Sequence, residues 1–221
     1  MMLARIQRGI LPLVLLAISG WAWFAATAEE PFGWRWCVLP LIALPHAPIL
    51  GLEFALLAWF GHSTPAPRPA LTQLISAWWG EVWAGAAVFG WRQPWASTDI
   101  PDDVRRNRPS RQRGVVLVHG FVCNRGLWNP WMSSLRMRDR AFVAVNLEPI
   151  WGSIDEYVTL IDAAVERVQD VTGLPPVVVA HSMGGLICRS YLARHGIERV
   201  DRLFTLATPH AGSLLSKIGF G

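Results

Sequence analysis

The segment VVVAHSMGGL, residues 177–186, decides the fold of the C-terminal half of the chain. Residues 177–180 form a short apolar run, which is typical of a strand buried on both faces of a parallel sheet. A serine held in a sharp turn after such a strand needs small residues two positions before and after it, because the backbone folds back tightly. Ala180 and Gly184 occupy these two positions around Ser182. The segment therefore predicts a strand, a tight turn at Ser182 and a helix.

The pentapeptide Ala180-His181-Ser182-Met183-Gly184 is a variant of the pattern G-x-S-x-G, with alanine in the first small position. A match of five residues is weak evidence for a catalytic serine by itself, because such a match occurs often by chance. The context is specific, because a strand is expected before the serine, a helix after it, and His119-Gly120 stands at the end of an earlier strand. A serine placed in this way serves as a nucleophile when a base lies within reach of its hydroxyl.

The rest of the C-terminal half alternates short apolar runs with amphipathic stretches, as expected for a sheet covered by helices. In the clearest predicted helix, Ser153 is the N-cap, Glu156 lies in the first turn and Gly173 ends the helix. We predict strands at 115–118, 142–145, 177–180 and 202–207, and helices at 127–138, 154–172 and from the serine turn to about His195.

The composition points to a membrane. Hydrophobic residues make up 52% of the 221 residues, only 16% are charged, and 13 are Trp. Typical soluble domains carry about 25% charged residues, so much of this surface faces something other than water. The net charge of +4 is too small to indicate nucleic-acid binding. The three cysteines show no metal or disulfide spacing, so we expect no metal and no cofactor.

Residues 10–28 carry no charge and are long enough to cross the roughly 30 Å of a bilayer core, so they predict a first transmembrane helix. The alternative is a cleaved signal peptide, since Arg5 and Arg8 precede the apolar run and small residues end it. Trp21 and Trp23 favour a transmembrane helix, because such aromatics mark the membrane interface.

A second transmembrane helix is predicted at 36–60, which is apolar except for His46 and Glu53. Three prolines, at positions 40, 45 and 48, predict a kink in its first half. Glu53 is either a functional carboxylate inside the membrane or a residue near a helix end. The positive-inside rule then places the N-terminus and everything after residue 62 in the cytoplasm, with both helices in the bacterial inner membrane.

Residues 63–70 form a proline-rich connector, and residues 71–91 are rich in Trp with one charge, Glu81. We expect an interfacial helix there, although a third transmembrane helix, which would invert the topology, stays open. The acidic positions 99–103 and the arginines at 105–113 then predict an exposed linker, or a contact with anionic lipid heads. The predicted domains are a membrane anchor at 1–62, an interfacial helix and basic linker at 63–113, and a catalytic-type domain at 114–221.

Three segments resemble bacterial lipases and esterases of the α/β-hydrolase family, in matching order and roughly matching spacing. They are VLVHGF at 116–121, VVVAHSMGGL at 177–186 and TLATPHAGS at 205–213. The resemblance covers residues 114–213, and some lipases of the family carry the same alanine at the turn. It implies the N-terminal part of an α/β-hydrolase: a mostly parallel sheet with flanking helices, here preceded by two transmembrane helices.

By this resemblance Ser182 is the nucleophile, and the backbone amides of Phe121 and Met183 form the oxyanion hole. His119 and Gly120 shape the loop that carries the first amide, and His119 is not the general base. Two fixed amide dipoles stabilise the charge that develops on a carbonyl oxygen under attack, and loss of one donor typically costs about 3 to 4 kcal/mol.

The family places its acid and its histidine after later strands, in the order Ser, Asp or Glu, His. Of the histidines that follow Ser182, His195 is too far along the helix. His210 follows a strand and is the remaining candidate base, although the resembled family does not use it. His181 is expected to pack and not to transfer protons. The sequence therefore predicts a truncated hydrolase whose acid and base are not encoded in it, or a complete protein that has lost catalysis.

We expect a membrane-anchored esterase or lipase that cleaves a carboxylic ester through an acyl-enzyme on Ser182. A thioesterase, amidase or peptidase would use the same turn and the same hole. The rival expectation is an inactive membrane-bound domain that binds lipid or protein. The expected partners are the lipid bilayer, an ester or lipid substrate and a protein that covers the open sheet edge.

Overall fold

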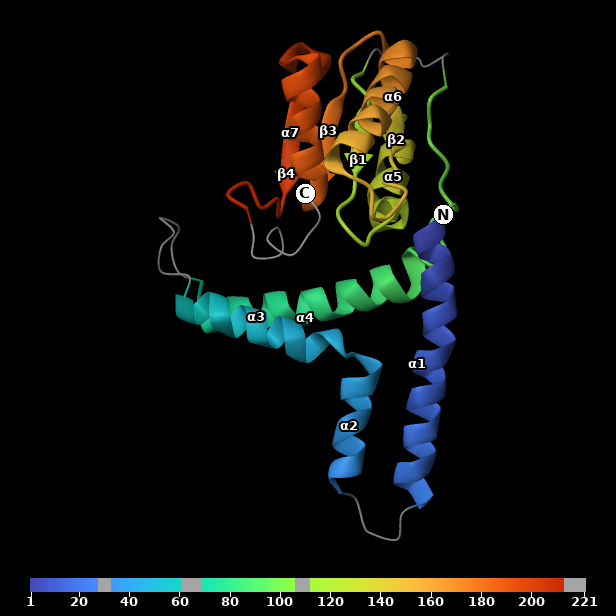
Figure 1. The fold of residues 1–221 in the computed structure, drawn as a ribbon, viewed down its shortest axis with the longest axis vertical. Coiled ribbons are helices and arrows are strands. Elements are labelled where there is room, and N and C mark those ends of the chain that lie inside the picture. Colours follow the sequence, from blue (N-terminus) through green and yellow to red (C-terminus); the bar gives the residue numbers. More distant parts are fainter. Residues whose placement is uncertain (28–32, 61–68, 106–111, 213–221) are drawn as a thin grey trace. The chain divides into compact units, whose positions relative to one another are not determined.

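The computed structural model describes residues 1–27, 33–60, 69–105 and 112–212 (Figure 1). The chain divides into two compact units. One comprises Met1–Ile6 and Arg92–Gly221, and the other comprises Gln7–Trp91. Most of the predicted connector at 63–70, most of the predicted arginine run and the last residue of the TLATPHAGS segment lie outside the described residues.

The larger unit is built on a parallel sheet. Its strands are β1 (Val115–Val118), β2 (Phe142–Ala144), β3 (Val177–His181) and β4 (Arg202–Leu206), in the order β2-β1-β3-β4. β3 is central to the candidate site, because Ala180 pairs with Val118 of β1 on one side and with Thr205 of β4 on the other. All four predicted strands are present, and the α/β class is confirmed.

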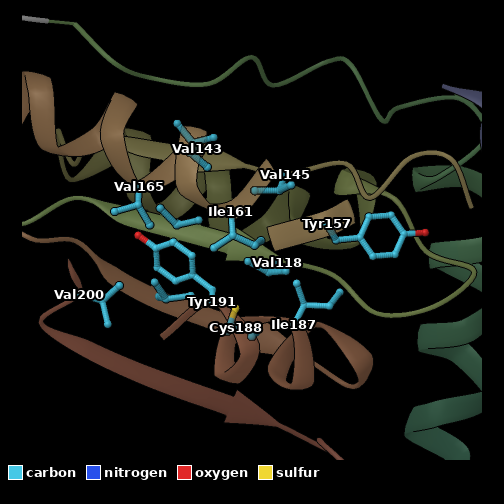
Figure 2. Close-up of a cluster of buried hydrophobic side chains, with 14 of the residues drawn as sticks. Val118, Val143, Val145, Tyr157, Ile161, Val165, Ile187, Cys188, Tyr191 and Val200 are labelled. Atoms are coloured by element: carbon cyan, nitrogen blue, oxygen red, sulfur yellow. The ribbon is translucent and has the colours of Figure 1, made fainter. Parts of the chain in front are cut away.

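Alternate residues of β1 point to opposite faces of the sheet, as the period of two in a strand requires. Val116 and Val118 belong to the core cluster that includes side chains of α6 (Ile154–Thr172) and α7 (Met183–His195), and Figure 2 shows Val118 in this cluster. On the other face, Val115 and Leu117 pack with side chains of η3 (Arg125–Trp128) and α5 (Asn129–Met137). Helices therefore cover both faces of the sheet at β1, which is apolar and buried throughout, as is β2.

The helix α6 begins and ends as its sequence predicts. Ser153 Oγ accepts a hydrogen bond from the Glu156 amide at 3.2 Å, and Glu156 Oε2 accepts one from the Ser153 amide at 2.7 Å. This reciprocal pair satisfies two amides at the helix start. Gly173 follows the helix with φ of 68°, a left-handed conformation that glycine adopts without strain.

Residues 93–105, which we call the strap, pack along the sheet unit. Asp103 exchanges two backbone hydrogen bonds of 3.0 Å with Phe142, at the outer edge of β2. Asp103 is only 5% exposed, and Asp102 forms ion pairs with Arg125 at 2.8 Å and Arg167 at 2.9 Å. The strap thus differs from the exposed linker predicted at these positions, because its acidic side chains find partners on the sheet unit.

The smaller unit consists of helices. They are α1 (Met2–Thr27, which starts in the other unit), α2 (Trp34–Ala43), α3 (His46–Phe60), α4 (Leu71–Ala87) and the π-helical turn η2 (Val88–Arg92), which continues into the strap. Among the described residues, α1 is the one helix long and apolar enough to cross a membrane by itself. A signal sequence would pass the same test.

The predicted second transmembrane helix is two helices, because the chain bends by 84° between Trp34–Ala43 and His46–Trp59. Pro45 lies at this break, where its ring disfavours a continuous helix. The polar atoms near the break find partners on α4. His46 Nε2 lies 2.9 Å from the carbonyl oxygen of Val82, and the Trp78 indole donates to the carbonyl of Ala47 at 2.9 Å. These contacts join α3 to α4.

Candidate active site

Ser182 lies between β3 and α7, in a strained backbone conformation. Its φ is 52° and its ψ is −126°, which L residues rarely adopt. Its amide donates to the carbonyl of Leu206 at 2.8 Å, and its carbonyl accepts from the Gly185 amide at 3.0 Å. Such strain persists only where the surrounding structure holds it, and it clusters at functional sites.

The small residues around Ser182 leave no room for larger ones. Ala180 is fully buried in β3. A Cβ on Gly184 would lie 2.5 Å from the carbonyl oxygen of His119, and a Cβ on Gly120 would lie 2.8 Å from Cβ of Ser182. The turn after β1 therefore packs directly against the turn after β3. This is the physical reason why small residues stand at these positions.

Thr208 is a site residue that sequence reasoning did not single out. Its Oγ1 donates to the carbonyl of Ser182 at 3.0 Å. Its side chain also packs so tightly on α7 that a Cβ on Gly185 would lie 2.2 Å from that same Oγ1. The threonine of the TPH segment was visible in the sequence, but its contact with the serine turn follows only from the pairing of β4 with β3.

His119 is buried, 1% exposed, and holds two loops together. Its Nε2 accepts a hydrogen bond from the Leu147 amide at 3.1 Å. Its Nδ1, 2.8 Å from the carbonyl oxygen of Gly120, must therefore carry the proton and donate. Burial is the main cause that lowers the pKa of His119 to about 4, and the nearby His181 lowers it further. The hydrogen bond to Gly120 acts in the opposite direction and raises the pKa. The ring is neutral at pH 7, and both nitrogens are occupied.

The two amides predicted to form the oxyanion hole stand next to these turns. Phe121 follows Gly120 directly, and Val122 has a φ of 52°, which bends the loop sharply. Met183 is the first residue of α7. Within the described part of the chain, neither the Phe121 nor the Met183 amide donates to a protein acceptor.

The candidate base His210 has its described hydrogen-bond partners on Arg189 and Thr205, and none of them is the Ser182 hydroxyl. Its Nδ1 lies 3.3 Å from a guanidinium nitrogen of Arg189, which donates, so its Nε2 carries the proton and lies 3.0 Å from Oγ1 of Thr205. His195 stacks on Tyr191 at the far end of α7. His181 ends β3, immediately before the serine.

Asp201 forms an ion pair with Arg113 at 3.2 Å, and its amide donates to the carbonyl of Pro176, just before β3 begins. Glu198 lies in the short helix η4 (Ile197–Arg199), which also precedes β4. Both acids therefore lie near the start of the strands, whereas Ser182 follows the end of β3. Across the described ranges, no hydrogen bond involves the Ser182 hydroxyl.

No group of three His, Cys, Asp or Glu side chains among the described residues could hold a metal ion. Cys188 is buried in α7, and burial raises the pKa of its thiol to about 12. Such a thiol stays protonated and inert at neutral pH.

Comparison with known proteins agrees with this fold. Residues 114–219 match the family described as alpha/beta hydrolase fold. These residues, slightly less than half of the chain, are therefore similar to the α/β-hydrolase family, which supports a hydrolase by ancestry. No curated protein matches the chain.

Similar solved structures include the Bacillus licheniformis lipase BlEst2 in its mature form, at 25% identity and a TM-score of 0.45, over 53% of this chain and 49% of that one. The propeptide form of the same lipase matches at 24% identity and a TM-score of 0.45, over 53% of this chain and 27% of that one. A Paleococcus ferrophilus monoacylglycerol lipase matches at 20% identity and a TM-score of 0.38, over 47% of this chain and 44% of that one. The chain thus matches at most half the length of each of these lipases.

Proposed function

We propose that this protein is a membrane-anchored serine hydrolase that cleaves a carboxylic ester through an acyl-enzyme on Ser182. The observation that carries the proposal is the strained backbone at Ser182, held at the carboxyl end of β3 against the Gly120 turn. Strain of this kind is retained where it presents a reactive side chain.

The proposed chemistry uses two amides and one hydroxyl. The Ser182 oxygen attacks the ester carbonyl, its proton passes to a base, and the tetrahedral oxyanion accepts hydrogen bonds from the Phe121 and Met183 amides. The C–O bond to the alcohol then breaks, the base returns the proton to the leaving alcohol, and water hydrolyses the acyl-enzyme. His119 stays neutral and holds the oxyanion loop.

The general base and its acid are the parts that the described residues do not supply. His210 is oriented by Arg189 and Thr205, and His119 has both nitrogens occupied. We therefore propose that polypeptide outside residues 1–221 provides the acid and the base. An esterase is favoured over a thioesterase, amidase or peptidase because a membrane anchor keeps the site beside ester-linked lipid.

The anchor is proposed to cross the bacterial inner membrane twice, through α1 and through the bent pair α2–α3, with α4 at the interface and the hydrolase unit in the cytoplasm. Large apolar side chains on these helices are exposed, which supports contact with lipid. Examples are Leu13, Leu16, Trp23, Leu52, Leu57, Trp79 and Trp83.

Topology is testable by cysteine labelling in intact cells. In a background with Cys37, Cys123 and Cys188 replaced by Ala, a membrane-impermeant maleimide should label Glu30→Cys directly. It should label Arg68→Cys only after permeabilisation. Labelling of both positions from outside would contradict the proposed orientation, and loss of residues 1–28 from the mature protein would identify a signal peptide.

Catalysis is testable with a fluorophosphonate, which reacts with activated serines. It is applied to the chain and to a longer form that follows the reading frame past residue 221. The proposal expects the longer form to be labelled, Ser182→Ala to abolish labelling, and Ser134→Ala, on helix α5, to leave it unchanged. Absence of labelling in the longer wild-type form would reject the hydrolase.

The rival is an inactive membrane-bound domain that binds lipid or protein. It is favoured by the observation that no described residue hydrogen-bonds to the Ser182 hydroxyl. A protein partner along the sheet is part of this alternative, because Phe204 on the outer strand β4 is 50% exposed. Stable capture of a partner by a protein that no fluorophosphonate labels would support it.

A further inference from the structure

The loop that follows β1 is held by the strap. Asn124 is only 2% exposed, and its Nδ2 donates to the carbonyl of Gln93 at 3.0 Å. Its Oδ1 accepts from the Gly126 amide at 2.8 Å. One buried side chain therefore bonds the strap and, at the same time, orders the loop in which it lies.

The backbone just before the strap also touches the loop directly. A Cβ on Gly126 would lie 2.5 Å from the carbonyl oxygen of Arg92, the residue that immediately precedes the strap. The Gln93 side chain is fully buried, and it lowers the pKa of the Cys123 thiol, which burial raises. Gln93 is thus bonded by Asn124 and lies near the neighbouring loop residue Cys123.

Further contacts fix the strap on the sheet unit. Asn129 Nδ2 donates to the carbonyl of Ala96 at 2.8 Å. Arg125 donates to the carbonyl of Ile100 at 2.9 Å, and Asp102 accepts from the Ala144 amide at 3.1 Å. Because the strap is bonded along its length, Gln93 offers the loop a fixed surface.

We infer that the strap positions the oxyanion loop, with Gln93 and Asn124 as positioning residues. The inference rests on the proposed function, since it concerns the amide of Phe121. Val122 has a φ of 52° and lies between Phe121 and the bonded pair Cys123-Asn124. A β-branched residue is strained there, so the loop keeps this shape only while both sides hold it. His119 and Gly120 hold one side, and Gln93 holds the other through Asn124.

This arrangement links the membrane helices to the site through the chain itself. The π-helical turn η2 ends at Arg92, and the strap begins at Gln93. The residues that leave the anchor are therefore the same residues that hold the loop. The amide of Phe121 is ordered only when this connecting segment is bonded in place.

The test compares Asn124→Ala with Asn129→Ala in the full chain. Both variants remove a hydrogen bond to a strap carbonyl, but only Asn124 also orders the oxyanion loop. Hydrogen–deuterium exchange is followed in peptides covering residues 119–126. We expect exchange to rise about tenfold in Asn124→Ala, as expected for a lost buried hydrogen bond, with little change in Asn129→Ala.

Asn124→Asp is a near-isosteric second variant that keeps the acceptor for Gly126 but replaces the donor to Gln93 with a buried carboxylate oxygen facing the Gln93 carbonyl. It is expected to raise exchange in the same peptides. Equal exchange in wild type, Asn124→Ala and Asn124→Asp would overturn the inference. So would exchange that rises equally over β3 and α6, because the effect would then be general destabilisation.

Fluorophosphonate labelling of the longer form gives a second readout. The inactivation rate constant is expected to fall about tenfold in Asn124→Asp while the apparent affinity for the probe stays unchanged, as for a lost interaction made mainly in the transition state. Unchanged labelling kinetics in a labelled wild type would overturn the positioning role. Absence of labelling in wild type would reject the proposed hydrolase, whereas exchange would still test the action of the strap on the loop.

Discussion

Gly120 and Ser182 meet across the tops of two adjacent strands, with no space for one additional carbon between them. A Cβ on Gly120 would lie 2.8 Å from Cβ of Ser182 and 3.3 Å from its hydroxyl oxygen. The turn at Gly120 and the turn at Ser182 are therefore one packed structure, and each one's position depends on the other.

Gly120→Ala should displace the Ser182 turn. The added methyl meets Cβ of Ser182 well inside normal contact, and overpacking of this kind costs about 1 to 3 kcal/mol. We expect at least a tenfold loss of fluorophosphonate labelling in the longer form. Gly80→Ala in α4 is the control, because a Cβ there meets nothing within 4 Å. Equal labelling of the two variants would show that the contact is not rigid.

Thr208→Val should loosen the serine turn while nearly preserving its shape. The substitution removes the hydrogen bond of 3.0 Å to the Ser182 carbonyl, and we expect the free energy of unfolding to fall by about 1 kcal/mol. Thr208→Ser keeps a hydroxyl at this position and should therefore retain most of the free energy of unfolding that Thr208→Val loses. Thr205→Val serves as a comparison, because the Thr205 hydroxyl contacts His210 and not Ser182. Urea denaturation in detergent, followed by Trp fluorescence, measures the free energy of unfolding of each variant.

Stability should fall as the pH drops from about 6.5 to about 4, because the folded-state pKa of His119 is lowered from 6.5 to about 4. The unfolded chain takes up a proton in this window and the folded chain does not, so acid favours unfolding. The shift of the His119 pKa contributes about 3 kcal/mol to the free energy of unfolding. This contribution is fully present above pH 6.5 and is lost as the pH falls to about 4.

His119→Asn removes this titration and serves as the test. We expect the variant to be less stable at pH 7, because the Leu147 amide loses its acceptor. Its unfolding free energy should also change less than that of wild type between pH 7 and pH 4.5. Parallel pH profiles for both proteins would show that His119 is not the titrating group.

Ser153→Ala should destabilise the sheet unit by about 1 kcal/mol, the usual effect of losing an N-cap. Glu156→Ala should have a smaller effect, and the double variant should lose less than the sum, because the two side chains form one reciprocal pair. Thr159→Ala, on the exposed face of α6, provides the matched control. Strict additivity would mean that the capping box contributes nothing as a unit.

The elements that the sequence predicted well are those with strong local signals. The apolar runs of β1 and β3 are continuous because helices cover both faces of the sheet, and α6 has both a capping box and a terminal glycine. The serine turn was predictable for a related reason. Only small residues fit beside it, so Ala180 and Gly184 are visible as a spacing along the chain.

The predictions that differ from the structure depended on contacts distant in sequence. The acidic positions of the strap resemble an exposed linker until Arg125 and Arg167, contributed by other elements, are placed beside Asp102. Residues 36–60 read as one kinked helix. Composition predicts a kink at proline but not its angle, and the 84° bend accompanies the bonds of His46 and Ala47 to α4.

The sequence by itself determined the α/β class, the four strands and the serine turn, because apolar periodicity, helix caps and small residues at fixed spacing are local properties of a chain. The α/β-hydrolase family entered through the resemblance of three segments. Only the tertiary structure decided that Thr208 holds the Ser182 carbonyl, that His119 is a neutral bridge between two loops, and that Gln93 meets Asn124. These contacts join residues far apart in the chain, and their energies depend on burial and on distances that only the folded sheet creates.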